Sequence, residues 1–406
     1  MKKLLITAVL ILTYAHSSLY AQDKNTLSDQ AEAWLITVGP GKEIYQLWGH
    51  STLRIKDDIN KIDRVYNFGV VPMGDPEWAG NFILGNLWYQ VDSYSYPVFY
   101  AGYTYMDRSL RQIKLNLDRA EIQTLYDFMN WRVQPGNNIY LYLFFHDNCS
   151  TRIRDLPKKL ENAEINFADW DKDITFRELF APYLKNNSWK RFGLEFMLNS
   201  MVDQKLDLYT AAGLPDYLEM LFSRSVISDE NGTRPLAGSK PEYLNSVNVE
   251  ANPPDFWYSP LLVFSIVFAI AILLRFKKRN MKAFDFILFF IAGLLGGLLF
   301  FLWVFTNHIY GHHNWNMLWA MPLHIFGAFL VFGKGSVKKW YFRINAAVLA
   351  LIPVFLIFIT QRMPLAAFPL IMTLLFRSID NGELFRPIIG FTGRIIAKVR
   401  RNKASG

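Results

Sequence analysis

The sequence predicts an α+β domain that is exported from the cytoplasm, followed by an α-helical transmembrane bundle of about five helices. Three observations carry this prediction. The first part of the 406-residue chain mixes alternating and helix-period patterns, whereas the rest carries long apolar runs. The N-terminus has the basic start, apolar stretch and small-residue exit of a secretory signal, which we expect to be cleaved after Ala21. Basic residues cluster beside alternate apolar runs.

We expect the chain to divide into five regions. They are a signal peptide over residues 1–21, an exported domain over 22–224, a linker over 225–255, a transmembrane domain over 256–376 and a basic cytoplasmic tail over 377–406. The linker is expected because its sequence is rich in Gly, Pro, Ser and Asn, which favour turns over long elements.

The exported domain opens with three predicted strands, over residues 33–38, 45–56 and 64–70. A turn between the second and the third makes these two strands antiparallel neighbours. The pairing brings either Asn67 or Tyr66 close to His50, which lies near the start of the second strand. Because Asn is a poor strand former, Asn67 is alternatively a structural residue at an irregular point of its strand.

The next stretch, residues 72–105, is rich in aromatic side chains and has several Gly and Pro breaks. It either forms a surface for an acyl chain or belongs to the core, where aromatic side chains are common. A strand is expected over 111–117. Asp118 then caps a helix predicted over 119–132, with Glu121 completing a capping box.

Cys149 is the single cysteine of the sequence. It follows a strand-like aromatic run and the pair Asp147-Asn148, whose short oxygen side chains cap helices. The thiol is therefore expected in the first turn of a helix over 150–160, where unpaired N–H groups and the helix dipole favour a thiolate. A lone cysteine in an exported chain forms no internal disulfide, so we predict a nucleophile. The alternative is a small buried residue.

A cysteine nucleophile needs a base, and His50 is predicted to supply it. Gly49 before it permits a close approach of the backbone. His146 competes for this role, although its closeness to Cys149 in the sequence favours a part in shaping the loop. The histidine precedes the cysteine, which is the reverse of the order in papain. Helices over residues 176–184, 193–202 and 211–222 are expected to pack behind the cysteine helix.

Five apolar segments follow the linker, and the first two reach the ~20 residues that cross a bilayer comfortably. The segments cover residues 256–274, 284–305, 317–332, 344–360 and 364–376. Basic residues cluster after the first, third and fifth, so the positive-inside rule places the two sparsely charged loops and the exported domain outside. The net charge of +8 is thus a topology signal, and no nucleic-acid partner is expected.

The outward loop over 308–316 concentrates polar side chains beside the membrane. His308 and His312 have a spacing seen in metal ligands, but no carboxylate or cysteine completes a set, so no metal is expected. We expect the loop to hold a lipid headgroup or to line a route to the thiol. The residues expected to bind substrate are Asn148, His312, His313, Asn314 and Asn316. No phosphate-binding or other cofactor motif is found, so no cofactor is expected.

Four stretches carry a family resemblance, namely residues 48–51, 66–69, 147–155 and 312–319 together with Pro322. They resemble the Lnb family of bacterial lipoprotein N-acyltransferases, formerly a domain of unknown function. The likeness covers nearly the whole mature chain, and the Asn-Cys pair is its most specific piece. The histidine-first order also resembles permuted papain-like enzymes such as lecithin retinol acyltransferase.

The resemblance implies a permuted papain-like exported domain and acyl transfer through a thioester on Cys149, with His50 at the position expected for the base. It leaves the third catalytic residue open, and Asn67 is the candidate. It further implies a phospholipid as acyl donor and, as acceptor, the N-terminal amine of diacylglyceryl-cysteine lipoproteins. Such an enzyme is expected in the cell inner membrane as a multi-pass protein whose catalytic domain lies in the periplasm.

Two other functions remain open on the sequence. An exported cysteine peptidase or cell-wall amidase would keep the thiol and use water as the acceptor, although several membrane segments add little to such an enzyme. A non-enzymatic membrane scaffold would bind a partner through the exported domain, and its thiol would carry out no chemistry.

Overall fold

The computed structural model describes residues 26–72, 76–247, 253–277 and 279–384. The expected signal peptide and most of the expected basic tail lie outside these residues. The chain divides into two compact units, which we call the sheet unit and the helical unit. The sheet unit comprises Met1–Ile174 and Lys205–Glu250, and the helical unit comprises Thr175–Gln204 and Ala251–Gly406. This agrees with an α+β chain that has an N-terminal sheet domain and C-terminal helices.

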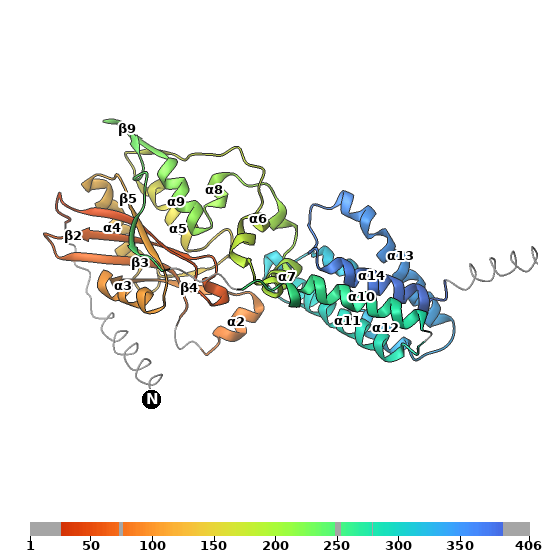
Figure 1. Cartoon of the computed structure of the whole chain (residues 1–406). Coiled ribbons are helices and arrows are strands. Elements are labelled where there is room, and N and C mark those ends of the chain that lie inside the picture. The colour runs from red at the N-terminus through yellow and green to blue at the C-terminus, as the bar shows by residue number, and fades with distance from the viewer. Residues whose placement is uncertain (1–25, 73–75, 248–252, 278, 385–406) are drawn as a thin grey trace, which may run out of the picture. The chain divides into compact units, whose positions relative to one another are not determined.

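A seven-stranded antiparallel sheet organises the sheet unit, in the order β10-β5-β1-β2-β3-β4-β6 (Figure 1). Its strands are β1 (Glu32–Val38), β2 (His50–Asp57), β3 (Ile62–Val70), β4 (Trp88–Ser95), β5 (Leu110–Lys114), β6 (Ile139–Leu141) and β10 (Glu242–Asn245). The predicted second strand is shorter than expected, because its first residues form the 3₁₀ helix η1 (Ile44–Gln46). The strand itself begins at His50.

Alternation along the strands gives the sheet two apolar faces. Leu35 and Leu53 point to one face, where they join a core with helices α4 (Arg119–Arg132), α5 (Cys149–Arg154) and α9 (Pro215–Arg224). Ile36 and Val65 point to the other face and pack with Phe99 of α3 (Tyr96–Tyr105). The capping box predicted at the start of α4 is present between Asp118 and Glu121. A further helix, α2 (Trp78–Leu84), precedes β4.

Residues expected to form a linker instead carry strands. The described part of residues 225–255 contains β8 (Val226–Asp229) and β9 (Gly232–Pro235), which form a small sheet with β7 (Glu164–Asn166). Strand β10 then extends the main sheet beside β5. Ile227 is fully buried, which a linker would not require. The Gly, Pro and Asn residues therefore separate short strands here.

The segment Thr175–Gln204 departs from expectation because it belongs to the helical unit. It contains α6 (Phe176–Phe180), η3 (Ala181–Leu184), α7 (Ser188–Met197) and η4 (Ser200–Asp203). We expected these helices behind the cysteine helix, but Phe192 and Phe196 of α7 pack with Phe264 and Trp319. Of the expected helices, only α9 in this region packs against α5, next to the short α8 (Leu208–Ala211).

The helical unit contains helices over all five predicted apolar segments (Figure 1). They are α10 (Pro260–Phe276), α11 (Lys282–Val304), α12 (His324–Leu330), α13 (Ser336–Phe358) and α14 (Ala367–Asn381), with short turns η5 (Phe256–Tyr258), η6 (Ile309–Gly311) and η7 (Trp315–Leu318). In the described part of the chain, α11 and α13 alone are long and apolar enough to cross a membrane, while α10 is a shorter apolar helix. The expectation that the first two segments have spanning length is thus corrected: the first is shorter, and the fourth is longer.

Candidate active site

Cys149 is the first residue of α5, and Asn148 caps this helix. The Asn148 Oδ1 accepts hydrogen bonds from the backbone N–H groups of Ser150 and Thr151, at 2.9 and 3.0 Å. Its Nδ2 donates to the carbonyl oxygens of Phe144 and Gly213, at 2.7 and 2.8 Å. The side chain is buried, and both ends are fully used within the protein. Asn148 therefore fixes the position of the thiol, and the expectation that it contacts substrate does not fit this geometry.

His50 starts β2 and faces Asn67 on the neighbouring strand β3. Its Nε2 lies 2.8 Å from the Asn67 Oδ1. An amide oxygen only accepts, so Nε2 carries the hydrogen and Nδ1 is left to accept the proton of the thiol. Of the two strand residues expected near the imidazole, Asn67 is the one that reaches it. Tyr66 points to the other face of the sheet, where its hydroxyl donates to Asn130.

The electrostatics of the site favour a thiolate. Burial raises the pKa of Cys149, but the His50 charge and hydrogen bond, the Ser51 backbone N–H and the Ser150 hydroxyl lower it to about 7. Burial lowers the pKa of His50, and the opposing charge and hydrogen bond of Cys149, with the Asn67 hydrogen bond, raise it above its ordinary value. The two groups thus stabilise each other as a thiolate and an imidazolium near neutral pH. His146 is not the partner, and burial lowers its pKa.

Gly49 explains why the histidine can occupy this place. Its φ is +82°, a conformation that side chains disfavour, and a Cβ there would meet the carbonyl oxygen of Val38 at 2.6 Å. The glycine therefore lets the chain turn sharply into β2 directly before the imidazole.

Two residues that sequence reasoning did not single out lie beside the histidine. The Tyr103 ring of α3 stacks on the imidazole of His50, with centroids 6.4 Å apart and an interplanar angle of 25°. Burial raises the pKa of Tyr103 to about 12, so its hydroxyl stays protonated. Arg108 is buried and donates from Nε and Nη2 to the Gly39 carbonyl oxygen, at 2.9 and 2.8 Å. Its guanidinium lies over the Tyr103 ring and adds positive charge near the sulfur.

Tyr140 on β6 is a third residue that the sequence did not reveal. Its hydroxyl is buried, and it has no hydrogen-bond partner within the described residues. Burial raises its pKa well above the usual value, and the charge of Cys149 adds to this effect. The ring packs edge-on to Phe68, and the Arg152 guanidinium lies 4.5 Å from its centroid. Its only signal in the sequence is membership of the aromatic run before Asp147.

The loop residues expected to bind substrate lie in the helical unit, and two of them have a structural task. Asn314 and Asn316 are buried, and both donate from Nδ2 to the carbonyl oxygen of Phe196, at 2.9 and 3.0 Å. Asn316 Oδ1 accepts from the Trp319 indole, and Asn314 Oδ1 accepts from Gln361. With their polar groups occupied and buried, Asn314 and Asn316 are not available to a substrate, which corrects the expectation.

Of the two histidines of this loop that were expected to bind substrate, His312 is partly exposed and His313 is exposed. His312 Nε2 lies 2.9 Å from the carbonyl oxygen of Thr306. The His313 ring lies 4.8 Å from that of Trp303, and its backbone has a φ of 48°. Within the described residues, no group of three or more His, Cys, Asp or Glu side chains is arranged to hold a metal ion.

The features so far describe a protein with a sheet domain that carries a cysteine–histidine pair and a helical unit in which α11 and α13 are long and apolar enough to cross a membrane. Family models match two parts of the chain. Residues 20–181 match the Lnb N-terminal periplasmic domain, and residues 252–385 match the Lnb transmembrane domain. Together the matches cover well over half of the sequence. The chain belongs to the Lnb family, and it is therefore a membrane protein with a periplasmic part.

Family membership suggests a role similar to that of a lipoprotein N-acyltransferase. No curated protein and no solved structure matches the chain significantly. The site itself must therefore support any statement about mechanism.

Proposed function

We propose that the protein is a lipoprotein N-acyltransferase of the inner membrane. It moves a fatty acyl group from a phospholipid, through a thioester on Cys149, to the N-terminal amine of a diacylglyceryl-cysteine lipoprotein. The observation that carries this proposal is the linear array of Cys149, His50 and Asn67, in which the thiol has a pKa of about 7. Such an activated thiol suits covalent acyl transfer near neutral pH.

In the first half-reaction, the thiolate sulfur of Cys149 attacks the carbonyl carbon of an acyl ester. A tetrahedral oxyanion forms and then collapses, which breaks the bond between the carbonyl carbon and the alcohol oxygen. The imidazolium of His50 gives its proton to the departing alcohol. The products are a thioester on Cys149 and a lysophospholipid, and His50 is left neutral.

In the second half-reaction, the α-amine of the lipoprotein attacks the thioester carbonyl. His50 takes the proton lost by the amine, and the sulfur leaves as a thiolate, so the amide product and the starting ion pair appear together. An α-amine has a pKa of ~8, so much of it is unprotonated without further help. Cys149 is 8% exposed, and this burial protects the thioester from water.

The oxyanion needs donors at the start of α5. Asn148 already occupies the N–H groups of Ser150 and Thr151 in the first turn. The N–H of Cys149 itself is left for this role. We assign the second donor to the hydroxyl of Tyr140, because it is buried, protonated and free of any other partner within the described residues.

The fold supports a permuted papain-like assignment for the sheet unit. Helix α5 carries the nucleophile and packs against β2 and β3, which supply His50 and Asn67 from neighbouring strands. The histidine strand precedes the cysteine helix in the chain. For the helical unit we propose a multi-pass arrangement in which α10 to α14 together form the membrane domain. The distribution of basic residues favours a periplasmic location for the sheet unit.

A mass measurement tests the proposal. Purified protein incubated with phospholipid should gain one acyl group on Cys149, and hydroxylamine should remove it because it cleaves thioesters. Cys149→Ala should gain nothing. Adding a diacylated lipopeptide should then consume the adduct and yield an N-acylated peptide. Alkylation of the wild-type protein under the same conditions shows whether Cys149 is reactive. If the thiol is reactive and yet no acyl group is gained, thioester transfer is ruled out.

The same preparation separates the two competing functions. Release of free amines from peptidoglycan or peptides would identify a hydrolase that uses the same thiol. Unchanged lipoprotein acylation in cells that carry Cys149→Ala at normal abundance would instead favour a scaffold.

A further inference from the structure

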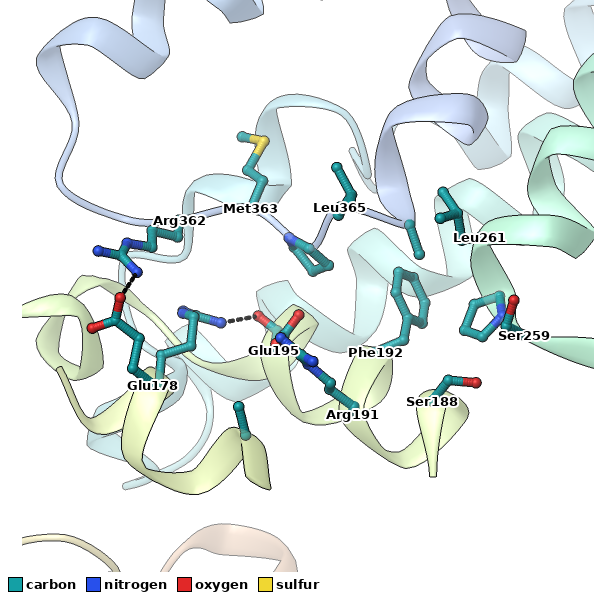
Figure 2. A pocket seen from close by; sticks show the side chains of 15 residues that line it. Glu178, Ser188, Arg191, Phe192, Glu195, Ser259, Leu261, Arg362, Met363 and Leu365 are labelled. Atoms are coloured by element: carbon teal, nitrogen blue, oxygen red, sulfur yellow. Dashed lines mark hydrogen bonds and ion pairs between the residues drawn. The ribbon is translucent and has the colours of Figure 1, made fainter. Parts of the chain in front are cut away.

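A pocket of about 350 Å³ is lined by residues of the helical unit, and none of them belongs to the candidate active site. Helices α6 and α7 line one side, and the start of α10 and the residues before α14 line the other. Figure 2 shows its two different ends: Arg362 and Glu178 lie at one, and Phe192 and Leu261 lie at the other. Its size is that of an ordinary ligand site, and its lining suits a molecule with one charged and one apolar end.

The pocket borders residues that are typical of a membrane interface. Directly before α10, the side chains of Phe256, Trp257 and Tyr258 are 60, 81 and 55% exposed. The indole of Trp189, on α7, donates to the carbonyl oxygen of Tyr258 at 2.6 Å. Exposed aromatic residues at the end of an apolar helix mark the level of the lipid headgroups. Ser259 and Pro260, which follow these aromatic residues, line the pocket. The proposed membrane orientation thus places the pocket at headgroup depth, on the side opposite the basic cluster that follows α10.

Charges of both signs surround the polar end. Arg362 Nη1 donates to the Glu178 Oε1 at 2.6 Å, and Arg191 Nε donates to the Glu195 Oε1 at 2.7 Å. Both arginine side chains are about half exposed, so part of each guanidinium group can be reached from outside the protein. The Arg362 hydrogen bond lowers the pKa of Glu178, so this carboxylate is charged at neutral pH.

The Arg362–Glu178 pair is exposed, and such pairs are individually weak, so a ligand can join or replace it at small cost. In the other pair only Arg191 is exposed, since the Glu195 side chain is 10% exposed. Guanidinium groups bind phosphate oxygens strongly, and carboxylates bind ammonium groups. The N-terminal ends of α10 and α14, both at the pocket, add partial positive charge. Arg177 is also in the lining, but it is buried and paired with Asp203, so its role is structural.

We propose that this pocket binds the headgroup of a zwitterionic, amine-bearing phospholipid. Arg191 and Arg362 contact its phosphate, and Glu178 and Glu195 contact its amine. Phe192, Leu261 and Leu365 contact the glycerol and the first carbons of the acyl chains. The inference uses the proposed membrane orientation, but it goes beyond the acyl-transfer proposal because it needs no chemistry at Cys149.

Lipid binding by the full-length protein tests the inference. Delipidated protein in detergent is titrated with phosphatidylethanolamine, and bound lipid is counted by native mass spectrometry. The variant Arg191→Gln with Arg362→Gln should bind at least about tenfold more weakly, which corresponds to ~1.4 kcal/mol. The control is Arg119→Gln with Lys205→Gln, which removes the same charge from exposed ion pairs of the sheet unit and should bind as the wild type does.

A second pair of measurements tests the amine. Phosphatidylglycerol carries the phosphate without an amine, and it should bind the wild type more weakly than phosphatidylethanolamine. Glu178→Gln with Glu195→Gln should abolish this preference, and the amide at position 178 can still accept the capping hydrogen bonds of α6. Soluble glycerophosphoethanolamine should compete only weakly, because it lacks the apolar contacts. Equal competition by free phosphate would show an unspecific anion site and overturn the inference.

Two results keep this inference separate from the proposed function. Thermal unfolding must show that the variants are folded before their binding is compared. Cys149→Ala should bind phosphatidylethanolamine as the wild type does, whatever the outcome of the thioester experiment. Wild-type lipid affinity in the folded double arginine variant would overturn the site, even if the protein proved to be an acyltransferase.

Discussion

At the scale of single residues, the reactivity of this protein follows from what surrounds one sulfur atom. Burial alone would make the Cys149 thiol less acidic, yet the imidazole and the Ser51 N–H reverse that effect. The orienting hydrogen bond from His50 to Asn67 uses one ring nitrogen and thereby commits the other to the thiol. The protonation state of the Cys149 thiol, its position and its access to solvent are thus set by different neighbouring residues.

The pH dependence of alkylation follows from these pKa shifts. The thiolate is the reactive form, so the rate of Cys149 alkylation by iodoacetamide should rise with pH, with its midpoint at about 7. His50→Ala removes the stabilising charge and leaves burial, so the midpoint should move to higher pH. His146→Ala should leave it unchanged. Since Cys149 is the single cysteine, the modified protein is counted directly by mass. A midpoint in the range of an ordinary thiol in the wild type would contradict the predicted ion pair.

Tyr140→Phe separates catalysis from stability. The variant loses one hydroxyl that has no partner within the described residues, so the free energy of unfolding should stay the same or rise slightly. Removal of an oxyanion donor should nevertheless slow formation of the thioester about 100-fold, with little change in the apparent affinity for lipid. Tyr142→Phe, two residues along the chain, serves as the comparison. Wild-type acylation by Tyr140→Phe would leave the second oxyanion donor unassigned.

Sequence reasoning proposed Cys149, His50 and Asn67, which the structure brings together, because a lone thiol, a glycine before a strand and the pairing of adjacent strands are local signals. It did not find Tyr103, Arg108 or Tyr140, since each reaches the site through packing that a one-dimensional pattern does not encode. Asn314 and Asn316 were wrongly predicted to bind substrate, because a local signal was present but misleading. Polar groups in a loop beside a membrane resemble binding groups, but here they bond a buried carbonyl oxygen.

At the scale of elements, α5 is a short helix that depends on its cap. Six residues cannot sustain a helix by propensity alone, so Asn148 and the packing against β2 and β3 hold the thiol in place. The same dependence links the helix to α9, because Asn148 also bonds the Gly213 carbonyl that precedes it. The cap therefore joins three parts of the sheet unit.

Asn148→Ala should reveal this dependence. It removes the acceptor of two N–H groups and the donor to two carbonyl oxygens, so we expect a loss of about 2–4 kcal/mol in the stability of the sheet unit. Asn148→Ser keeps the cap oxygen and should lose less. Hydrogen exchange of the α5 amides measures both effects. The matched control is Asn137→Ala, at a partly exposed position, which also removes a hydrogen bond to a carbonyl oxygen. Equal exchange in Asn148→Ala and the control would contradict a central role for the cap.

Among the elements, long periodic patterns were predicted well and short ones were not. Helix α4 has the predicted bounds, because its capping residues are a strong local signal. The alternation along β2 and β3 predicted both strands, although β2 begins only at His50. The residues taken as a linker form β8 to β10, since strands of four residues interrupted by Gly and Pro have the composition of a loop. Apolar segments gave the places of the membrane helices but not their lengths.

At the scale of the whole molecule, the chain enters the helical unit twice. Residues 175–204 leave the sheet unit, pack with the later helices and return. Where they return, the backbone N–H of Leu206 donates to the carbonyl oxygen of Ile174 at 3.0 Å. The two ends of this segment, which we call the excursion, therefore lie side by side. The parts of the sheet unit before and after it are in direct contact.

A pair of truncated proteins tests this division. Residues 26–247 with the excursion intact should aggregate, because Phe192 and Phe196 lose the apolar partners that they have in the helical unit. The same protein with residues 175–204 replaced by a short Gly-Ser linker should be soluble and monomeric in size-exclusion chromatography. It should also retain the low pKa of Cys149. Aggregation of both proteins to the same extent would show that the sheet unit needs the helical unit to fold.

The excursion has a consequence for biogenesis. During synthesis, residues 175–204 are made before α10 to α14. Their aromatic side chains therefore stay unpacked until these later helices have been translated. The N-terminal domain is thus not finished when it reaches the far side of the membrane. If translation stops before the last helices are made, residues 175–204 keep their apolar side chains exposed, and quality-control proteases can recognise such a segment.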